Sequence, residues 1–257
     1  MTPAQSALAE LPATPMPSIS ASPFGRHAGG NASELLSATQ REQLSRCSKL
    51  VRIRKDAVIF GEGQQSRSIF NLVRGMVEAY HVRGNGQRRI TAFMFPRDLF
   101  GLSENGRYCM TAQAVTPVIV CRIPLVSLTQ LMRDDPSLQL HLLCKACHEI
   151  RESQQHVLQV GHTEARLAAF LLMLARRNHE VGHSEESLPV KFQVDLPMSR
   201  NDIADYSALT VESVSRALHA LEELRLIRRV STRRIAILDE EGLCREAGDP
   251  AQSWPSR

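Results

Sequence analysis

The sequence predicts an α+β protein with an N-terminal β-roll, a long helix and a C-terminal helix-turn-helix. Three features of the sequence support this fold class. Residues 50–124 consist of short runs rich in β-branched residues and broken by glycines, and the stretch 140–157 contains neither glycine nor proline. Residues 196–238 hold two capped helical segments followed by a basic, alternating strand.

The composition narrows the classes of protein to which the chain can belong. With 257 residues, of which 43% are hydrophobic and 23% charged, the chain is long enough for two domains and typical of soluble globular proteins. The N-terminal residues lack the basic and apolar regions of a signal peptide, and no stretch reaches the roughly 18 consecutive apolar residues of a membrane span. We therefore expect a cytoplasmic protein without membrane contact, whose six cysteines are mostly thiols. The net charge of +4 is compatible with a nucleic-acid partner.

The first residues differ in composition from those that follow. Residues 1–33 contain five prolines and almost no charge, so they cannot assemble a core and are expected to form a disordered arm. From there to Pro124 the chain alternates β-rich runs, such as IFNLVRGMVEAYHV and PVIVCRIP, with glycine-containing turns. Residues 34–125 are therefore expected to form the β-roll.

After Pro124 the pattern becomes helical, and residues 126–161 are expected to contain a long dimerisation helix. Mostly apolar side chains recur at alternating steps of three and four, which places them on one narrow stripe with coiled-coil spacing. Such a stripe favours packing against the same helix of a second copy, and packing on the chain's own β-roll is the alternative. The residues expected in the dimer interface are Leu140, Leu143, Cys147, Ile150, Gln154 and Val157.

The predicted dimerisation helix contains the sequence CKACH, whose C-x-x-C-H pattern is that of covalent c-type haem attachment. If Cys144, Cys147 and His148 held a haem, the chain would be an electron carrier. The missing export signal and the position within a helix favour the other interpretation, in which both cysteines are small packing residues. Because Cys147 lies on the stripe and Cys144 flanks it, these thiols are candidates for an oxidation that locks the dimer.

The last part of the chain has the spacing of a helix-turn-helix. After a helix predicted over HTEARLAAFLLMLARR and a polar loop, Ser199 is placed to cap a short helix, and SAL forms a tight turn. Thr210 then caps a second helix that runs to about Leu224. We assign residues 162–238 to a DNA-binding domain and residues 239–257 to a C-terminal tail.

The second of these helices carries a polar face suited to reading base pairs. On it, Arg216 can donate two hydrogen bonds to guanine, Glu212 can accept one from cytosine, and Ser215 can serve either sense. A Glu–Arg pair on a solvated helix is the alternative interpretation of this spacing. A basic wing follows, which would place cations against phosphates and favours double-stranded DNA as the partner. Its arginines are Arg225, Arg228, Arg229, Arg233 and Arg234.

With these motifs the chain resembles the Crp/Fnr family of bacterial transcription regulators. The resemblance covers about residues 35–238 and rests most on LPMSRNDIADYSALTVESVSRAL, with EARLAAFLLMLARR before it and the glycine turns FGEG and DLFG in the roll. It implies a cyclic-nucleotide-binding-like β-roll, a dimerisation helix and a winged helix-turn-helix. It also implies a homodimer that recruits RNA polymerase, mostly as an activator.

Within the family, the E-x-x-S-R pattern resembles the FixK and Fnr branch, which acts in low-oxygen respiration or nitrogen-oxide metabolism. This resemblance implies a TTGAT-N4-ATCAA inverted repeat, with Arg216 and Glu212 on the G·C pair and Ser215 near a thymine. It further implies contacts to the DNA backbone. Those residues are Ser199, Arg200, Asn201, Thr210, Ser213 and Arg229.

The expected sensor departs from the members of the family that bind cyclic nucleotides. Leu102 stands where those members carry an acid. Those members also have an Arg-Ser/Thr-Ala run that holds the phosphate, whereas here Arg107 is followed by Tyr108 and Cys109. Because the groups that would pair with the ligand's charges are missing, we do not expect cyclic AMP to be the effector.

No cofactor is expected in the roll. The iron–sulfur cluster of oxygen-sensing Fnr proteins needs four thiolates, and the arm before Cys47 supplies none. Cys121, which matches the family's roll cysteine, is then expected to be a small buried hydrophobe. Two alternatives would gate the same regulator differently. One is a non-covalent haem that senses nitric oxide with His81 as its ligand, and the other is a thiol switch. No metal site and no catalytic constellation of an enzyme is recognisable.

Overall fold

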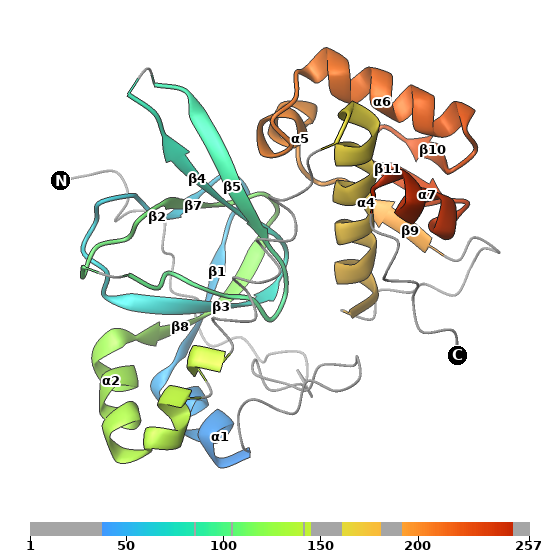
Figure 1. The fold of residues 1–257 in the computed structure, drawn as a ribbon. Coiled ribbons are helices and arrows are strands. Elements are labelled where there is room, and N and C mark those ends of the chain that lie inside the picture. The colour runs from blue at the N-terminus through green and yellow to red at the C-terminus, as the bar shows by residue number, and fades with distance from the viewer. Residues whose placement is uncertain are drawn as a thin grey trace. The chain divides into compact units, whose positions relative to one another are not determined.

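The computed structural model describes residues 38–84, 86–103, 105–140, 142–144, 161–180 and 192–248. The chain divides into two compact units, Met1–Glu149 and Ile150–Arg257. The first is built mainly of strands, and the second combines helices with a small sheet (Figure 1). The α+β fold class predicted from the sequence is confirmed.

The N-terminal unit is a β-roll made of two antiparallel four-stranded sheets. One sheet has the strand order β1-β8-β3-β6 and the other β2-β7-β4-β5. Helix α1 (Ala38–Cys47) precedes the strands and α2 (Leu125–Asp134) follows them. The strands are β1 (Lys49–Ile53), β2 (Val58–Phe60), β3 (Ser68–Arg74), β4 (Val77–Val82), β5 (Arg88–Met94), β6 (Leu99–Phe100), β7 (Thr111–Ala114) and β8 (Val118–Pro124).

Two hydrophobic clusters stabilise the roll. The larger one contains Leu72 and Val120, both fully buried. The smaller one joins Ile69 of β3 to Leu44 of α1 and Leu128 of α2. Because successive side chains of a strand point to opposite faces, β3 and β8 contribute to both clusters. The helices therefore cover a strand face that would otherwise expose apolar side chains.

The C-terminal unit is organised around the long helix α4. Its leucines at positions 167, 171 and 174 are at most 1% exposed, and α4 packs against α6, α7 and β9. The small sheet has the order β10-β11-β9, so β11 pairs with both neighbours. The elements are α4 (Thr163–Glu180), β9 (Phe192–Asp195), α5 (Arg200–Tyr206), α6 (Val211–Glu223), β10 (Ile227–Ser231), β11 (Arg234–Ile237) and α7 (Glu240–Glu246).

Helix α7 extends this unit beyond the boundary expected at residue 238. The Asp239 side chain caps it by accepting a hydrogen bond from the Gly242 N–H, and Leu243 is fully buried. A Cβ on Gly242 would meet the carboxylate of Asp239 and lie 2.6 Å from Leu226 Cδ2, so a larger residue would have to displace these side chains. The segment interpreted as a tail therefore contains a packed helix over its first residues.

The start of the expected dimerisation helix is helical, at residues 136–140 and 142–144. Leu140 and Leu143 are 59% and 60% exposed, and Cys144 is exposed as well. The arm at 1–33 and the rest of the stripe lie outside the described residues. Those stripe and motif residues are Cys147, His148, Ile150, Gln154 and Val157.

Candidate nucleic-acid interface

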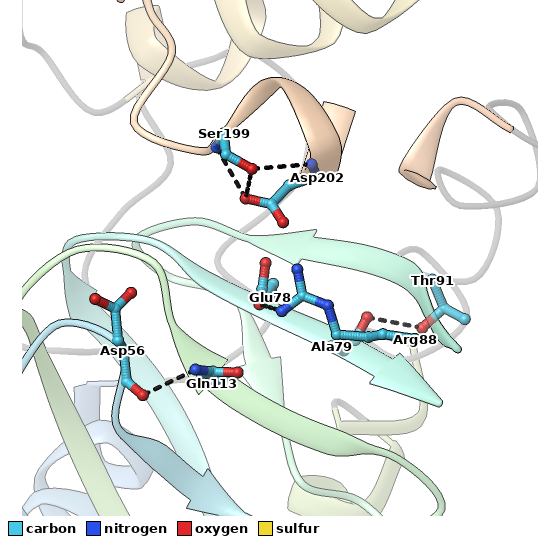
Figure 2. A network of polar contacts seen from close by, with 8 residues as sticks. All are labelled: Asp56, Glu78, Ala79, Arg88, Thr91, Gln113, Ser199 and Asp202. Carbon is cyan, nitrogen blue, oxygen red and sulfur yellow. Dashed lines mark hydrogen bonds and ion pairs between the residues drawn. The ribbon is translucent and has the colours of Figure 1, made fainter. Parts of the chain in front are cut away.

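Helix α5 begins with a capping box. The Ser199 hydroxyl accepts a hydrogen bond from the Asp202 N–H at 3.1 Å, and the Asp202 carboxylate accepts one from the Ser199 N–H at 2.8 Å (Figure 2). The inner face of the helix is buried through Ile203 and Ala204. The cap expected at Ser199 is confirmed, and it occupies a hydroxyl that the family resemblance assigns to a DNA phosphate.

Tyr206 fastens the short helix α5 to α4. Its ring centroid lies 5.5 Å from that of Phe170, and its hydroxyl lies 3.6 Å from the sulfur of Met173. Burial raises the pKa of Tyr206 to about 12, so the phenol is neutral at physiological pH. The first helix of the motif is thus held by packing against α4, and on its outer side Asn201 is exposed.

The expected turn between the two helices contains a residue with a left-handed backbone. Ala208 has a φ of 52°, and the following Leu209 N–H donates to the Ala204 carbonyl at 2.8 Å. Glycine is the residue most often found in this conformation. Because alanine occupies the position here, no glycine marks the turn in the sequence. The turn directs the chain into the second helix.

Helix α6 presents the polar face expected from the sequence. Thr210 caps it by accepting a hydrogen bond from the Ser213 N–H at 3.1 Å. Its inner face is apolar, with Val214, Ala217, Leu218 and Leu221 all buried. Its outer face exposes Glu212, Ser215, Arg216 and His219.

Glu212 and Arg216 do not form the solvated ion pair that is the alternative interpretation of their spacing. Within the described residues Arg216 belongs to no ion pair, and the pair on this face joins His219 Nε2 to Glu223 Oε1 at 3.4 Å. Hydrogen bonds from the backbone and from the Thr210 hydroxyl, and then the charge of Arg216, lower the pKa of Glu212. An anionic acceptor and an unpaired guanidinium therefore lie one turn apart on an exposed helix.

The wing is present as the hairpin of β10 and β11, and it is less purely basic than the sequence indicates. Arg229 pairs with Glu222 of α6, and Arg234 Nε lies 2.8 Å from Asp195 Oδ1 of β9. Both acids come from outside the arginine run. The remaining wing arginines are exposed and belong to no ion pair in the part of the chain that the structure describes. They are Arg225, Arg228 and Arg233.

Arg200, the first residue of α5, reaches across to the wing. Its Nη2 donates to the Thr232 carbonyl at 3.3 Å, whereas its Nη1 is buried and has no partner. Burial, and then the charge of Arg229, lower the pKa of Arg200. A buried guanidinium donor without an acceptor is a group that a phosphate oxygen would satisfy.

Replacing Ser199 with alanine is expected to lower the free energy of unfolding of the C-terminal unit by about 1 kcal/mol, because the Asp202 N–H loses its cap. Urea unfolding of the full chain measures the effect. Ser199→Asn is the matched control, since asparagine also caps helices well. An equal loss of stability in both variants would contradict the capping role.

In the β-roll, aromatic side chains fill the interior next to the position where the sequence departs from cyclic-nucleotide binders. Tyr108 is 6% exposed, stacks on Phe60 with ring centroids 3.8 Å apart, and donates its hydroxyl to the Ser68 carbonyl at 2.8 Å. Phe70 lies on the same cluster, 5.5 Å from Phe60 between centroids. Tyr108 is thus part of the core of the roll.

The two positions that hold the ligand in cyclic-nucleotide binders have other roles here. Arg107 is exposed, and its Nη1 donates to the Gly63 carbonyl at 2.7 Å. Leu102 is 48% exposed and carries no charge. Leu102 therefore offers no carboxylate to a ligand, and one guanidinium nitrogen of Arg107 is already bound to a backbone carbonyl.

The remaining candidate ligands in the roll are engaged in other ways. His81 Nδ1 lies 3.3 Å from Glu62 Oε1 on the surface. Cys121 is fully buried, and this burial raises the pKa of its thiol, as expected of a packing residue. Among the described residues, no three His, Cys, Asp or Glu side chains gather in a way that could hold a metal ion.

Comparison with known proteins identifies the family to which the chain belongs. The sequence matches the model of the Crp-like helix-turn-helix domain over residues 165–246 and that of the cyclic nucleotide-binding domain over residues 50–135. It is 36% identical over 193 residues to the nitrogen fixation regulation protein FixK of Azorhizobium caulinodans, covering 74% of this chain and 76% of that protein. The chain belongs to the Crp/Fnr family.

Two further similarities agree with this Crp/Fnr assignment. The transcriptional activator protein FnrA of Stutzerimonas stutzeri is 34% identical over 200 residues, which is 76% of this chain and 79% of that protein. The structure of FixK2 from Bradyrhizobium japonicum superposes with a TM-score of 0.69 at 30% identity, covering 80% of this chain and 99% of that one. The Crp/Fnr chain is therefore a DNA-binding transcription regulator and not an enzyme.

None of the helices that the structure describes in this Crp/Fnr regulator combines the length and the apolar character needed to cross a bilayer.

Proposed function

We propose that this regulator binds a TTGAT-N4-ATCAA inverted repeat as a homodimer. In each half-site Arg216 donates two hydrogen bonds to guanine and Glu212 accepts one from the paired cytosine, while Ser215 lies near a thymine. The observation that carries the proposal is the exposed Arg216, which has no ion-pair partner among the described residues and lies one turn from the anionic Glu212 on a capped helix.

Phosphate contacts would come from the N-terminal ends of both helices and from the wing. Partial positive charge at helix N-termini and exposed cations attract phosphate oxygens without regard to sequence. Arg225, Arg228 and Arg233 supply such cations on or beside the hairpin. The proposed contacts at the helix ends are Ser199, Arg200, Asn201, Thr210 and Ser213.

A second copy of the chain is the proposed partner of the stripe that begins at Leu140. Leucines 140 and 143 are more than half exposed, which supports a surface that a partner helix covers. The proposed interface continues through Cys147, Ile150, Gln154 and Val157. Oxidation linking Cys144 or Cys147 across this interface stays a prediction, which a non-reducing gel of Cys144→Ser and Cys147→Ser variants tests.

We place the regulator in low-oxygen or nitrogen-oxide metabolism, where it would recruit RNA polymerase without cyclic AMP. The similarity to FixK and FnrA and the E-x-x-S-R pattern of α6 support the setting. The buried Tyr108 and the exposed, uncharged Leu102 support independence from a cyclic nucleotide.

A mobility-shift experiment tests dimeric, effector-independent recognition. Purified full-length protein is titrated against a duplex with both half-sites, a duplex with one half-site scrambled, and the first duplex with added cyclic AMP. We expect tight binding to the intact repeat, much weaker binding to the single half-site, and no effect of cyclic AMP. Equal affinity for the first two duplexes would refute dimeric recognition of the repeat.

A further inference from the structure

Glu222 connects the recognition helix to the wing. It lies in the last turn of α6, and its two carboxylate oxygens both reach Arg229 of β10. Oε1 accepts a hydrogen bond from the Arg229 backbone N–H at 2.9 Å, and Oε2 lies 2.7 Å from Arg229 Nε and 2.6 Å from Nη2. One side chain thus holds both the backbone and the guanidinium of a wing residue.

The contact is made at the point where the wing ceases to be regular. Arg229 pairs with Ile235 in the β10–β11 ladder, and the register shifts between Arg229 and Ser231. Beyond Arg229 the hairpin tip therefore lacks the continuous ladder that would fix its direction. The contact of Glu222 with Arg229 is therefore in a position to determine the orientation of the hairpin tip relative to α6.

Glu222 is suited to this role by its charge. Hydrogen bonds from the Arg229 backbone and side chain lower the pKa of Glu222, so the carboxylate is anionic across the physiological range. When both oxygens of a carboxylate accept charge-assisted hydrogen bonds, the relative position of the two residues is fixed better than by a single hydrogen bond. The side chains are 29% and 43% exposed for Glu222 and Arg229, so water screens the pair only in part.

Arg200 completes the cluster from the other side. Its Nη2 donates to Thr232 at the wing tip, and the charges of Arg200 and Arg229 repel each other. The carboxylate of Glu222 offsets this repulsion for Arg229. The donor that lacks an acceptor in the cluster is Nη1 of Arg200.

We propose that Glu222 is a positioning residue that fixes the position of the wing relative to the recognition helix through Arg229. Arg229 then acts as a strut between the two elements, in place of the phosphate contact that the family resemblance implies for it, and Arg200 supplies the phosphate contact at this place. The inference rests on the proposed function in one respect, namely that α6 and the wing meet the same DNA duplex.

The experiment compares six full-length proteins. They are the wild type, the single variants Glu222→Gln, Arg229→Gln, Arg200→Gln and Glu223→Gln, and the double variant Glu222→Gln/Arg229→Gln. Fluorescence anisotropy gives the affinity for the inverted repeat and for a scrambled duplex over a range of salt concentrations. Glu223→Gln is the matched control. Glu223 is the next residue after Glu222, is exposed and contacts His219, so this variant removes the same charge without touching Arg229. Thermal melting of each variant reports whether it is folded.

We expect Glu222→Gln and Arg229→Gln each to weaken binding to the repeat by about tenfold for a dimer, the size of two partly exposed ion pairs. A double Glu222→Gln/Arg229→Gln variant should bind the repeat with the same affinity as either single variant, because both substitutions remove the same strut. Glu223→Gln, which only makes the protein more positive, should bind as tightly as the wild type or tighter.

The salt dependence separates a strut from a phosphate contact. Arg200→Gln should make the slope of log affinity against log salt shallower by roughly two for a dimer, whereas Arg229→Gln should leave it unchanged. A shallower slope for Arg229→Gln, additive losses in the double variant, or weakening by Glu223→Gln equal to that by Glu222→Gln would each overturn the inference. Because the slopes are also measured on scrambled DNA, a failure to prefer the repeat would be recognised separately as a failure of the proposed function.

Discussion

Replacing Arg216 with alanine is expected to remove the preference of this regulator for the G·C pair of its half-site. An arginine that donates two hydrogen bonds to guanine contributes about 1–3 kcal/mol of discrimination. The proposed homodimer makes two such contacts, so the specific binding free energy should fall by about 2–6 kcal/mol. Arg216 belongs to no ion pair among the described residues, so its removal leaves no buried acid behind.

The measurement is fluorescence anisotropy with the repeat and with a duplex in which both G·C pairs are changed to A·T. The wild type should lose affinity on this change, and Arg216→Ala should bind the two duplexes alike. His219→Ala is the matched control, because His219 is exposed on the same face and contacts Glu223. If Arg216→Ala still discriminated between the duplexes, base reading by Arg216 would be excluded.

Replacing Tyr108 with alanine is expected to lower the free energy of unfolding of the β-roll by about 3–5 kcal/mol, the usual cost of truncating a buried aromatic side chain. The variant loses the stack on Phe60 and leaves a cavity in the core, and the Ser68 carbonyl loses its donor. Urea unfolding followed by circular dichroism measures the change in the roll.

Two variants identify the source of this loss. Tyr108→Phe keeps the stack and removes only the hydroxyl, so we expect a loss of about 1 kcal/mol. Arg107→Ala changes the exposed neighbour and should alter stability by less than about 0.5 kcal/mol. A Tyr108→Ala protein as stable as Arg107→Ala would show that Tyr108 does not fill the core as described.

The elements that the sequence predicts well are those with local signals. Ser199 and Thr210 each lie three residues before the N–H that they cap, and the apolar face of α6 repeats with helical spacing. Strand β1 of the roll ends with the alternation of buried and exposed residues typical of a strand, in Val51, Arg52 and Ile53. Helix-turn-helix and roll could therefore both be inferred before the structure was known.

Features that depend on distant parts of the chain could not be predicted in this way. Arg234 lies 39 positions from its partner Asp195, and that acid is in the short strand β9, which has no strong pattern of its own. Helix α7 has a glycine as its third residue, which is unfavourable within a helix, although this glycine packs closely against Leu226. The pairing of Arg229 with Glu222 likewise depends on how the wing folds back onto α6, which composition does not reveal.

Sequence-specific recognition is measured by the ratio of the affinities for the intact repeat and for a scrambled duplex of equal length. Competition binding of the full-length protein at near-physiological salt gives this ratio. We expect a preference of at least about a thousandfold for the repeat, and an affinity for both duplexes that falls steeply as the salt concentration rises. Equal affinity for the two duplexes at every salt concentration would contradict it.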